Sequence, residues 1–440
     1  MMKVFSLITR LRGLTSRPFV RNVATVVLGA AASQAITMMF APIVARLYGP
    51  EVFGLQGIFI SVLGLFTSIS SLGYPVAIVL QKSDEDALKI IRLSVCVCMV
   101  ISAIVALIIK LYGDNLLSLL NARGISEFLY FLPAAMIFYV FNETLNQWLI
   151  RKNSFVFGAK YTAISAFVIN SLKTIAGTLL PSAIVLIAIN TFGQLLSFLL
   201  TLWGWQRFGK KIQIDTGKSE KKKTIWQLAK IHADFPLLRT PQNLINAISQ
   251  GLPVMLLSGL FGLESSGQYT LALTVLGVPS ALIANSVMAA FYPKITGLIN
   301  SDANPREHIV KATIGMAAVG FIPLLLILAA GPTLFEFVFG HQWRTSGIYA
   351  QLLAIWLFLQ FINKPAVASI PALKLQGGLL IYELFSTGSK VLALWLGFVL
   401  FKNDIVAIGL FSLFGSLAYV WLIHWVIRNS SNNDFKKQMV

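Results

Sequence analysis

Charged residues are scarce in this chain of 440 residues. Only 12% are Asp, Glu, Lys or Arg, whereas 56% are apolar. A soluble globular domain carries about 25% charged residues, so the low charge argues against that class. Acidic residues are the scarcer kind, with 17 against 35 Lys and Arg, and the net charge is +18. In a soluble protein this balance would indicate nucleic-acid binding, but the apolar content makes a nucleic-acid partner a poor interpretation.

Residues that carry chemistry are also few. The only cysteines, Cys96 and Cys98, lie in one apolar run, so they cannot cross-link separate elements or form a metal site. Four scattered histidines show no metal-ligand spacing, and the chain has neither a nucleophile motif nor a phosphate-binding loop for ATP. We therefore expect no enzyme, metal or cofactor. An ion gradient of H⁺ or Na⁺, the membrane potential, or consumption of the substrate on the far side would supply the energy.

Long apolar runs are abundant. A bilayer core takes about 20 apolar residues as a helix, so windows of that length with few charges mark candidate spans. The sequence predicts an all-α integral membrane protein with about twelve spans. Only Pro181 and Ser182 separate the fifth from the sixth, and ten or eleven spans stay open. The expected limits are 22–45, 54–80, 90–111, 127–149, 161–180, 183–206, 236–261, 269–292, 309–331, 347–370, 379–401 and 405–427.

The basic residues predict which way the chain is oriented. Both termini and the loops on their side hold 28 of the 35 Lys and Arg, against five in the opposite loops. Loops rich in Lys and Arg stay on the cytoplasmic side, so both termini are expected there. Residues 1–21 then form a basic cytoplasmic leader to an uncleaved first helix, and 428–440 form a cytoplasmic tail.

A basic polar segment near the middle of the chain indicates two six-helix lobes. It covers residues 207–235 and separates an N-lobe at 22–206 from a C-lobe at 236–427. It is expected to be a solvated linker, although it could also bind anionic lipid headgroups. A shift of 213 residues superimposes Glu51, Gly54 and 62–64 on Glu264, Gly267 and 275–277. Parallel repeats of this kind are found in transporters whose lobes enclose a central cleft.

Span seven carries the clearest polar face. Five residues recur at helical spacing, namely Arg239, Gln242, Asn243, Asn246 and Gln250. Polar side chains at bilayer depth usually face a bundle interior or a water-filled cavity. This stripe predicts a cavity for a polar, anionic or sugar-bearing ligand, and the alternative is hydrogen bonding between helices.

Further polar residues are expected in other spans. Asn142 and Asn146 in span four, Lys173 in span five and Lys390 in span eleven are candidate cavity residues, and Lys173 could instead pair with a carboxylate such as Glu143. Glu143 and Glu383 are candidates for coupling transport to H⁺ or Na⁺.

Several sequence blocks resemble a known family. They are residues 21–24 with Gln34, 45–54 (ARLYGPEVFG), 81–87 (QKSDEDA), 267–272 (GQYTLA) with Pro279, 291–294 (FYPK), and 339–343 (FGHQW) with Gly347. In these the chain resembles the polysaccharide-transport branch, the Wzx-type flippases, of the multidrug/oligosaccharidyl-lipid/polysaccharide exporter superfamily.

The resemblance implies an exporter fold of two lobes with alternating access. It also implies a bacterial inner-membrane protein that moves undecaprenyl-pyrophosphate-linked O-antigen or capsular repeat units, with a polymerase and a chain-length regulator as possible partners. Two alternatives stay open. One is a cation-coupled multidrug exporter of the same superfamily, and the other is a membrane-embedded polysaccharide polymerase or ligase.

Overall fold

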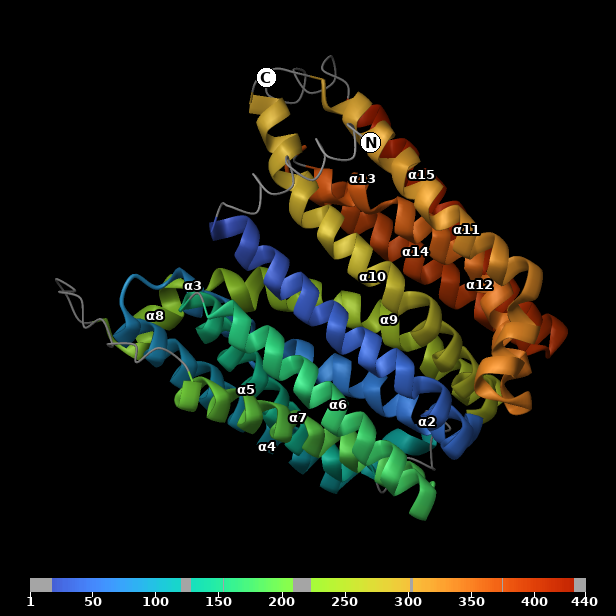
Figure 1. The fold of residues 1–440 in the computed structure, drawn as a ribbon, viewed down its shortest axis with the longest axis horizontal. Helices are drawn as coiled ribbons and strands as arrows, with labels where there is room; N and C mark the ends of the chain where they lie inside the picture. The colour runs from blue at the N-terminus through green and yellow to red at the C-terminus, as the bar shows by residue number, and fades with distance from the viewer. Residues whose placement is uncertain are drawn as a thin grey trace, which may run out of the picture. The chain divides into compact units, whose positions relative to one another are not determined.

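The computed structural model describes residues 18–119, 128–152, 154–208, 223–300, 304–373 and 375–430. Within these ranges all regular structure is helical (Figure 1). The basic leader lies outside the described residues except for its last four. So do residues 209–222 of the linker and the last ten residues of the tail.

The chain divides into two compact units. Unit 1 holds the residues up to Tyr48 together with 58–251, and unit 2 holds 49–57 together with 252–440. The division does not follow the linker, because most of the seventh span belongs to unit 1. The two six-helix lobes therefore stay a prediction.

Unit 1 is a bundle of long helices. Helices α4, α5, α6 and α7 pack in the pairs α4–α5, α5–α7 and α6–α7 (Figure 1). Gly204 on α7 permits one of these contacts, since an added Cβ would lie 2.0 Å from the ring of Tyr161 on α6. Its elements are α2 (Pro18–Ser70, with 49–57 assigned to unit 2), η1 (Tyr74–Val76), α3 (Ala77–Leu80), α4 (Asp84–Leu119), α5 (Leu132–Arg151), α6 (Phe155–Leu179), α7 (Ala183–Phe208), α8 (Ile225–Ile231), η3 (Phe235–Arg239) and α9 (Thr240–Phe261, as far as Gly251).

Unit 2 packs around α12. This helix contacts α10, α11 and α15, while α14 packs against α15. The core of unit 2 includes the fully buried side chains of Trp343, Tyr349 and Phe411. Its elements are α10 (Leu263–Asn300), α11 (Pro305–Phe339), η4 (His341–Trp343), α12 (Arg344–Ile362), α13 (Lys364–Ser369), α14 (Gln376–Leu396), η5 (Gly397–Phe401) and α15 (Asp404–Asn429).

Ten helices among the described residues are long and apolar enough to cross a membrane. One of them, Leu28–Ser70, includes most of each of the first two predicted spans and is interrupted at Gly49, where φ is 72°; the second prediction, 54–80, runs ten residues past its end. Glycine adopts this left-handed conformation at low cost, and Pro50 disfavours a helical residue before it. Helix α10 covers the predicted eighth span. The helical class is thus confirmed, whereas the number twelve stays a prediction.

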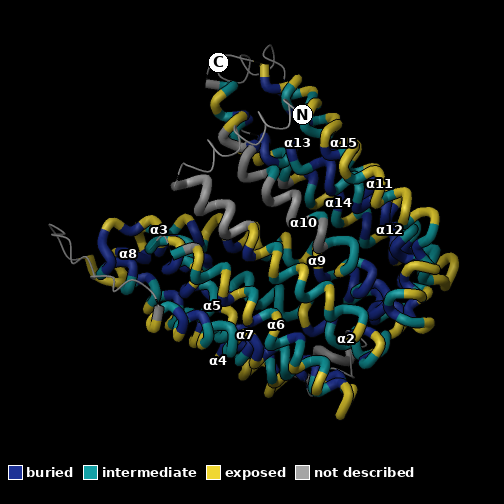
Figure 2. The backbone as a smooth tube through the Cα atoms, viewed as in Figure 1, coloured by how far each residue is buried: buried dark blue, intermediate teal, exposed yellow. Residues whose placement is uncertain are grey.

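The weakest predicted boundary is confirmed. Helix α6 ends at Leu179 and α7 begins at Ala183, so the turn lies at Pro181 and Ser182. Large apolar side chains remain exposed along the helices, such as Leu111 at 62% and Phe337 at 80%, and Figure 2 shows exposed residues recurring along α11. Exposing this much apolar surface to water is costly, which agrees with a lipid environment.

Candidate substrate cavity

Unit 1 contains a polar cavity of about 570 Å³. This volume is within the range of small-molecule sites, about 300–1,000 Å³. Ten of the fifteen lining residues have polar side chains. The lining comprises Ile60, Ser61, Gly64, Thr67, Ser68, Ser71, Gly73, Tyr139, Glu143, Arg239, Asn243, Asn246, Ala247, Gln250 and Gly251.

The first wall is the polar face of η3 and α9. Arg239, Asn243, Asn246 and Gln250, which the sequence predicts to share one helical face, all line this cavity. Gln250 Nε2 donates to Asn246 Oδ1 over 3.0 Å, which orients two of the amides. Gln242 is exposed but is not among the lining residues. With 3.6 residues per turn, a residue at i+3 lies farther round the helix from Arg239 than residues at i+4, i+7 and i+11.

The second wall comes from the last part of α2 and the residues directly after it, and it was not predicted from the sequence. Ser61, Gly64, Ser68 and Ser71 recur at i, i+3, i+7 and i+10, so one face of this segment is small and hydroxylated. Ser68 Oγ donates to the Leu65 carbonyl over 2.6 Å, which leaves its lone pairs to accept hydrogen bonds from a ligand. The same 3.6-residue period that revealed the amides of span seven could have revealed this face.

A close approach holds the two walls together. A Cβ added at Gly251 of α9 would lie 3.0 Å from Ser61 Cβ of α2. Glycine therefore lets the helices meet at this end of the cavity.

Helix α5 supplies the third wall through Tyr139 and Glu143, one helical turn apart. The Glu143 carboxylate lies within the electrostatic influence of Arg239 and close to the Ser71 hydroxyl. Arg239 packs 6.0 Å from the centre of the Phe235 ring and has no hydrogen-bond or ion-pair partner among the described residues. Its guanidinium donors are thus available to a ligand.

These groups define what the cavity can bind. A guanidinium can hold phosphate oxygens in two parallel hydrogen bonds, and the amides and hydroxyls can hydrogen-bond sugar hydroxyls. Across the described ranges, no cluster of three or more His, Cys, Asp or Glu side chains could hold a metal ion. The arrangement suits a polar, anionic, hydroxylated ligand.

Three other predicted cavity residues lie elsewhere in unit 1. Asn142 joins α5 to α7, because its Nδ2 donates to the Gln194 carbonyl over 2.5 Å. Asn146 is exposed and does not line the cavity. The Lys173 carbonyl accepts a 2.9 Å hydrogen bond from Tyr48, and its ammonium has no carboxylate within 4 Å in the described part of the chain, Glu143 included.

Lys390 and Glu383 lie on α14, in unit 2. The Lys390 side chain is buried, with Nζ 5.8 Å from the ring centres of both Trp356 and Phe411. This is a cation–π environment rather than a water-filled one. The unit 1 cavity therefore contains neither residue.

The long apolar helices define a multi-pass membrane protein, and unit 1 of this protein contains a polar cavity. Comparison with solved structures finds the same fold in proteins of known structure. An inward-facing multidrug resistance MATE family transporter of the MOP superfamily is 15% identical, with a TM-score of 0.75, and the match covers 93% of this chain and all of that one. The lipid II flippase MurJ in an inward closed conformation is 15% identical with a TM-score of 0.69, over 92% of this chain and 89% of MurJ.

Sequence comparison identifies the family. Residues 19–299 match the family described as polysaccharide biosynthesis protein, so the chain belongs to it. A curated relative, the succinoglycan biosynthesis transport protein ExoT of Rhizobium meliloti (strain 1021), is 21% identical over 96% of this chain and 83% of its own length. The resemblance to the polysaccharide-transport branch is confirmed, and the family bears out the expectation that the chain is not an enzyme.

Proposed function

We propose that the chain is a flippase for undecaprenyl-pyrophosphate-linked oligosaccharide repeat units, of the O-antigen or capsular kind, in the bacterial inner membrane. Both termini are cytoplasmic in this proposal, and the two lobes alternate access to the substrate. The observation that carries the proposal is the unpaired guanidinium of Arg239 in a cavity lined by amides and hydroxyls. A pyrophosphate beside a sugar chain offers the matching acceptors and donors.

Membership of the polysaccharide biosynthesis family and the names of two relatives support the substrate class. One relative is named a succinoglycan transport protein and the other a lipid II flippase. Both names concern glycans or glycolipids. A polymerase and a chain-length regulator that use the flipped unit would be functional partners.

The test is a deletion strain that lacks any redundant flippase. We expect single lipid-linked repeat units to accumulate on the cytoplasmic side while surface polysaccharide disappears, and the intact gene to restore both. Arg239→Ala should fail to restore them. Gln242→Ala is the matched control, because Gln242 lies on the same helix outside the cavity lining. Normal surface polysaccharide without trapped intermediates would overturn the proposal.

One observation favours a second candidate, a cation-coupled multidrug exporter. Tyr139 and Glu143 place an aromatic ring and a carboxylate in the same cavity, and both groups suit cationic drugs. Overexpression would then confer drug resistance that depends on Glu143. Resistance without any effect on surface polysaccharide would favour this candidate over the flippase.

A further inference from the structure

The short helix α8, between the basic linker and the seventh span, has two different faces. Leu228 is fully buried and Ala229 is 8% exposed. On the other face, Ile225, Trp226 and Ile231 are 41%, 71% and 54% exposed. A large tryptophan left this far exposed is unusual on a water-facing surface.

The buried face attaches α8 firmly to unit 1. Leu228 and Ala229 belong to a hydrophobic cluster with Tyr74, Ile78 and Trp148 from the ends of neighbouring spans. The helix begins with a capping box, in which Thr224 and Gln227 each accept a hydrogen bond from the other's backbone N–H. At its other end, Gln81 Nε2 donates to His232 Nε2 over 2.8 Å. Because α8 is held at both ends, the direction of its outer face is determined by the fold.

The outer face also carries positive charge. Lys223 and Lys230 are exposed, and Lys230 Nζ lies 5.9 Å from the centre of the Trp226 ring. Among the described residues, the nearest acidic side chain in sequence is Asp234, which follows the helix and is also exposed. Tryptophan beside lysine is typical of segments at the membrane–water interface, where the ring enters the headgroup layer and the ammonium meets lipid phosphates.

The position of α8 matches that layer. The candidate span Phe235–Phe261 begins three residues after His232, the residue at the C-terminal end of α8. In its first turn, Leu237 and Leu238 are 71% and 72% exposed. Figure 1 shows α8 beside α3, in the region of unit 1 where the ends of the spans meet. The apolar outer face of α8 therefore continues into the apolar start of a membrane span.

We propose that α8 is an interfacial anchor that binds the surface of an anionic phospholipid bilayer. Ile225, Trp226 and Ile231 insert at the boundary between headgroups and acyl chains, while Lys223 and Lys230 pair with lipid phosphates. Each lysine near an anionic surface strengthens binding to it about fivefold. The anchor holds the end of unit 1 and the start of the seventh span at one depth in the bilayer, whatever substrate the cavity takes.

The test places a spin label on α8 in the full-length protein. With Cys96 and Cys98 changed to Ser, Ile231→Cys carries the label on the outer face and leaves Trp226 in place. The protein is reconstituted in nanodiscs of phosphatidylcholine alone or with phosphatidylglycerol. Collisions with oxygen, which concentrates in lipid, and with a water-soluble nickel reagent report whether the label is docked. A second label at Leu107→Cys, on an exposed face of α4, must report lipid in every sample and so verifies folding.

We expect the label at position 231 to lie in the headgroup layer in both mixtures, and to be better shielded from the nickel reagent when phosphatidylglycerol is present. Lys223→Gln and Lys230→Gln together should reduce this preference, by about fivefold for each lysine. Lys311→Gln, a change of the same kind at an exposed position on α11, should not. Trp226→Ser should weaken docking in both lipid mixtures. A label equally exposed to water in both mixtures would overturn the proposal and leave a protein partner as the occupant of this face.

Discussion

Arg239 and Glu143, both in the described part of the chain, line one cavity from different helices without forming a direct ion pair. A guanidinium and a carboxylate form an ion pair when their nitrogen and oxygen atoms lie within about 4 Å of each other. Each of these two side chains therefore remains available to interact with a bound ligand. The cavity can thus hold an anionic group against Arg239 while Glu143 stays nearby as a negative charge.

Replacing Arg239 by Lys and by Gln separates charge from geometry. Lys keeps the positive charge but loses the planar fork that grips two phosphate oxygens. A hydrogen bond to a charged group contributes about 1.5–3 kcal/mol, so Arg239→Gln should weaken binding of a pyrophosphate lipid about tenfold to a hundredfold. Arg239→Lys should fall between Gln and the intact protein. Binding to the purified protein measures both, and a Gln variant that binds as tightly as the intact protein would contradict the assignment.

Glu143→Gln should strengthen binding of an anionic lipid. The substitution removes a negative charge that faces the same cavity as the proposed phosphate site, and like charges repel. The amide has nearly the same size as the carboxylate, so the volume of the cavity should stay the same. A titration with a pyrophosphate lipid tests this, with Asn146→Ala as the control outside the lining. Weaker binding would mean that Glu143 instead positions Arg239.

Gly251→Val should close one end of the cavity. An added Cβ at this position would lie 3.0 Å from Ser61 Cβ, and valine adds two further methyl groups. Overpacking of this kind costs about 1–3 kcal/mol. We expect a lower unfolding temperature together with loss of transport. Gly315→Val is the matched control, because nothing lies within 4 Å of its added Cβ and the residue is outside the cavity lining. A Gly251→Val protein as stable and active as this control would disprove the close contact.

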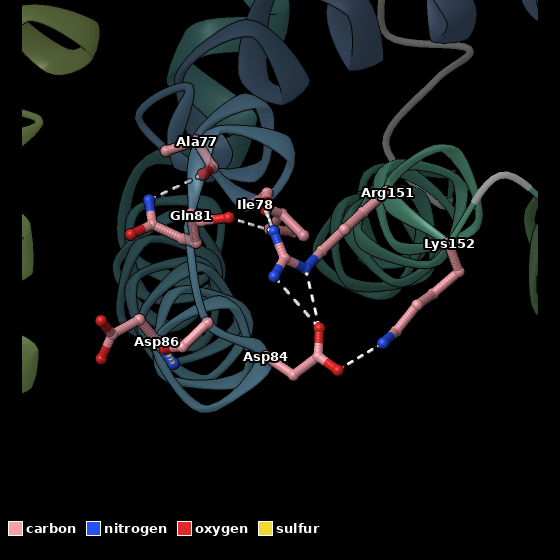
Figure 3. Close-up of polar contacts among 8 residues, drawn as sticks. Ala77, Ile78, Gln81, Asp84, Asp86, Arg151 and Lys152 are labelled. Atoms are coloured by element: carbon pink, nitrogen blue, oxygen red, sulfur yellow. Dashed lines mark hydrogen bonds and ion pairs between the residues drawn. The ribbon is translucent and has the colours of Figure 1, made fainter. Parts of the chain in front are cut away.

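Asp84→Asn should destabilise unit 1 strongly. The Asp84 carboxylate is buried, accepts from Arg151 Nε over 3.1 Å and is paired with Lys152, as Figure 3 shows. Arg151 also donates to the Gln81 carbonyl. Loss of one partner from a buried pair costs about 3–5 kcal/mol, because the remaining charges stay buried.

The control for Asp84 is an exposed ion pair. Glu307 and Lys311 form a pair at the start of α11 with side chains 66% and 72% exposed. Such exposed pairs contribute little to stability because water and salt screen them, so Glu307→Gln should barely change the unfolding temperature. Thermal unfolding of both variants in detergent makes the comparison. Equal effects of Asp84→Asn and Glu307→Gln would mean that the buried network does not stabilise the fold.

Acid should loosen α8. Burial lowers the pKa of His232 below its usual value, and the Lys223 charge lowers it further, while Asp234 opposes both. His232 Nε2 accepts a hydrogen bond from Gln81, which requires the neutral ring. A group whose pKa is lower in the folded state stabilises the fold fully above its unfolded pKa, about 6.5 for histidine, and loses this contribution as pH falls through the folded value.

Hydrogen exchange of residues 223–234 measures the acid effect. After correction for the intrinsic pH dependence of exchange, protection should fall between pH 7 and pH 5. His232→Gln cannot gain a proton, so its protection should not depend on pH in this range. A pH dependence that persists in this variant would assign the effect to another group.

The sequence predicted the repeating features of the fold, since these depend on local patterns. Apolar runs predicted helices that the structure bears out, and the turn at Pro181 and Ser182 followed from residues that lie within it. The polar face of span seven was visible for the same reason, because Arg239, Asn243 and Asn246 share one helix. The seryl face of α2 was missed because small hydroxylated residues are common in membrane helices that merely pack together.

The sequence by itself determined that this chain is a helical membrane protein of the polysaccharide biosynthesis family, because hydrophobic length and family blocks are properties of consecutive residues. Only the tertiary structure decided which polar residues meet. It brings Ser61, Glu143 and Arg239 together around one cavity, and places Lys390 between the rings of Trp356 and Phe411. The physical reason is that such neighbours come from different helices, and no local pattern specifies which faces of two helices pack against each other.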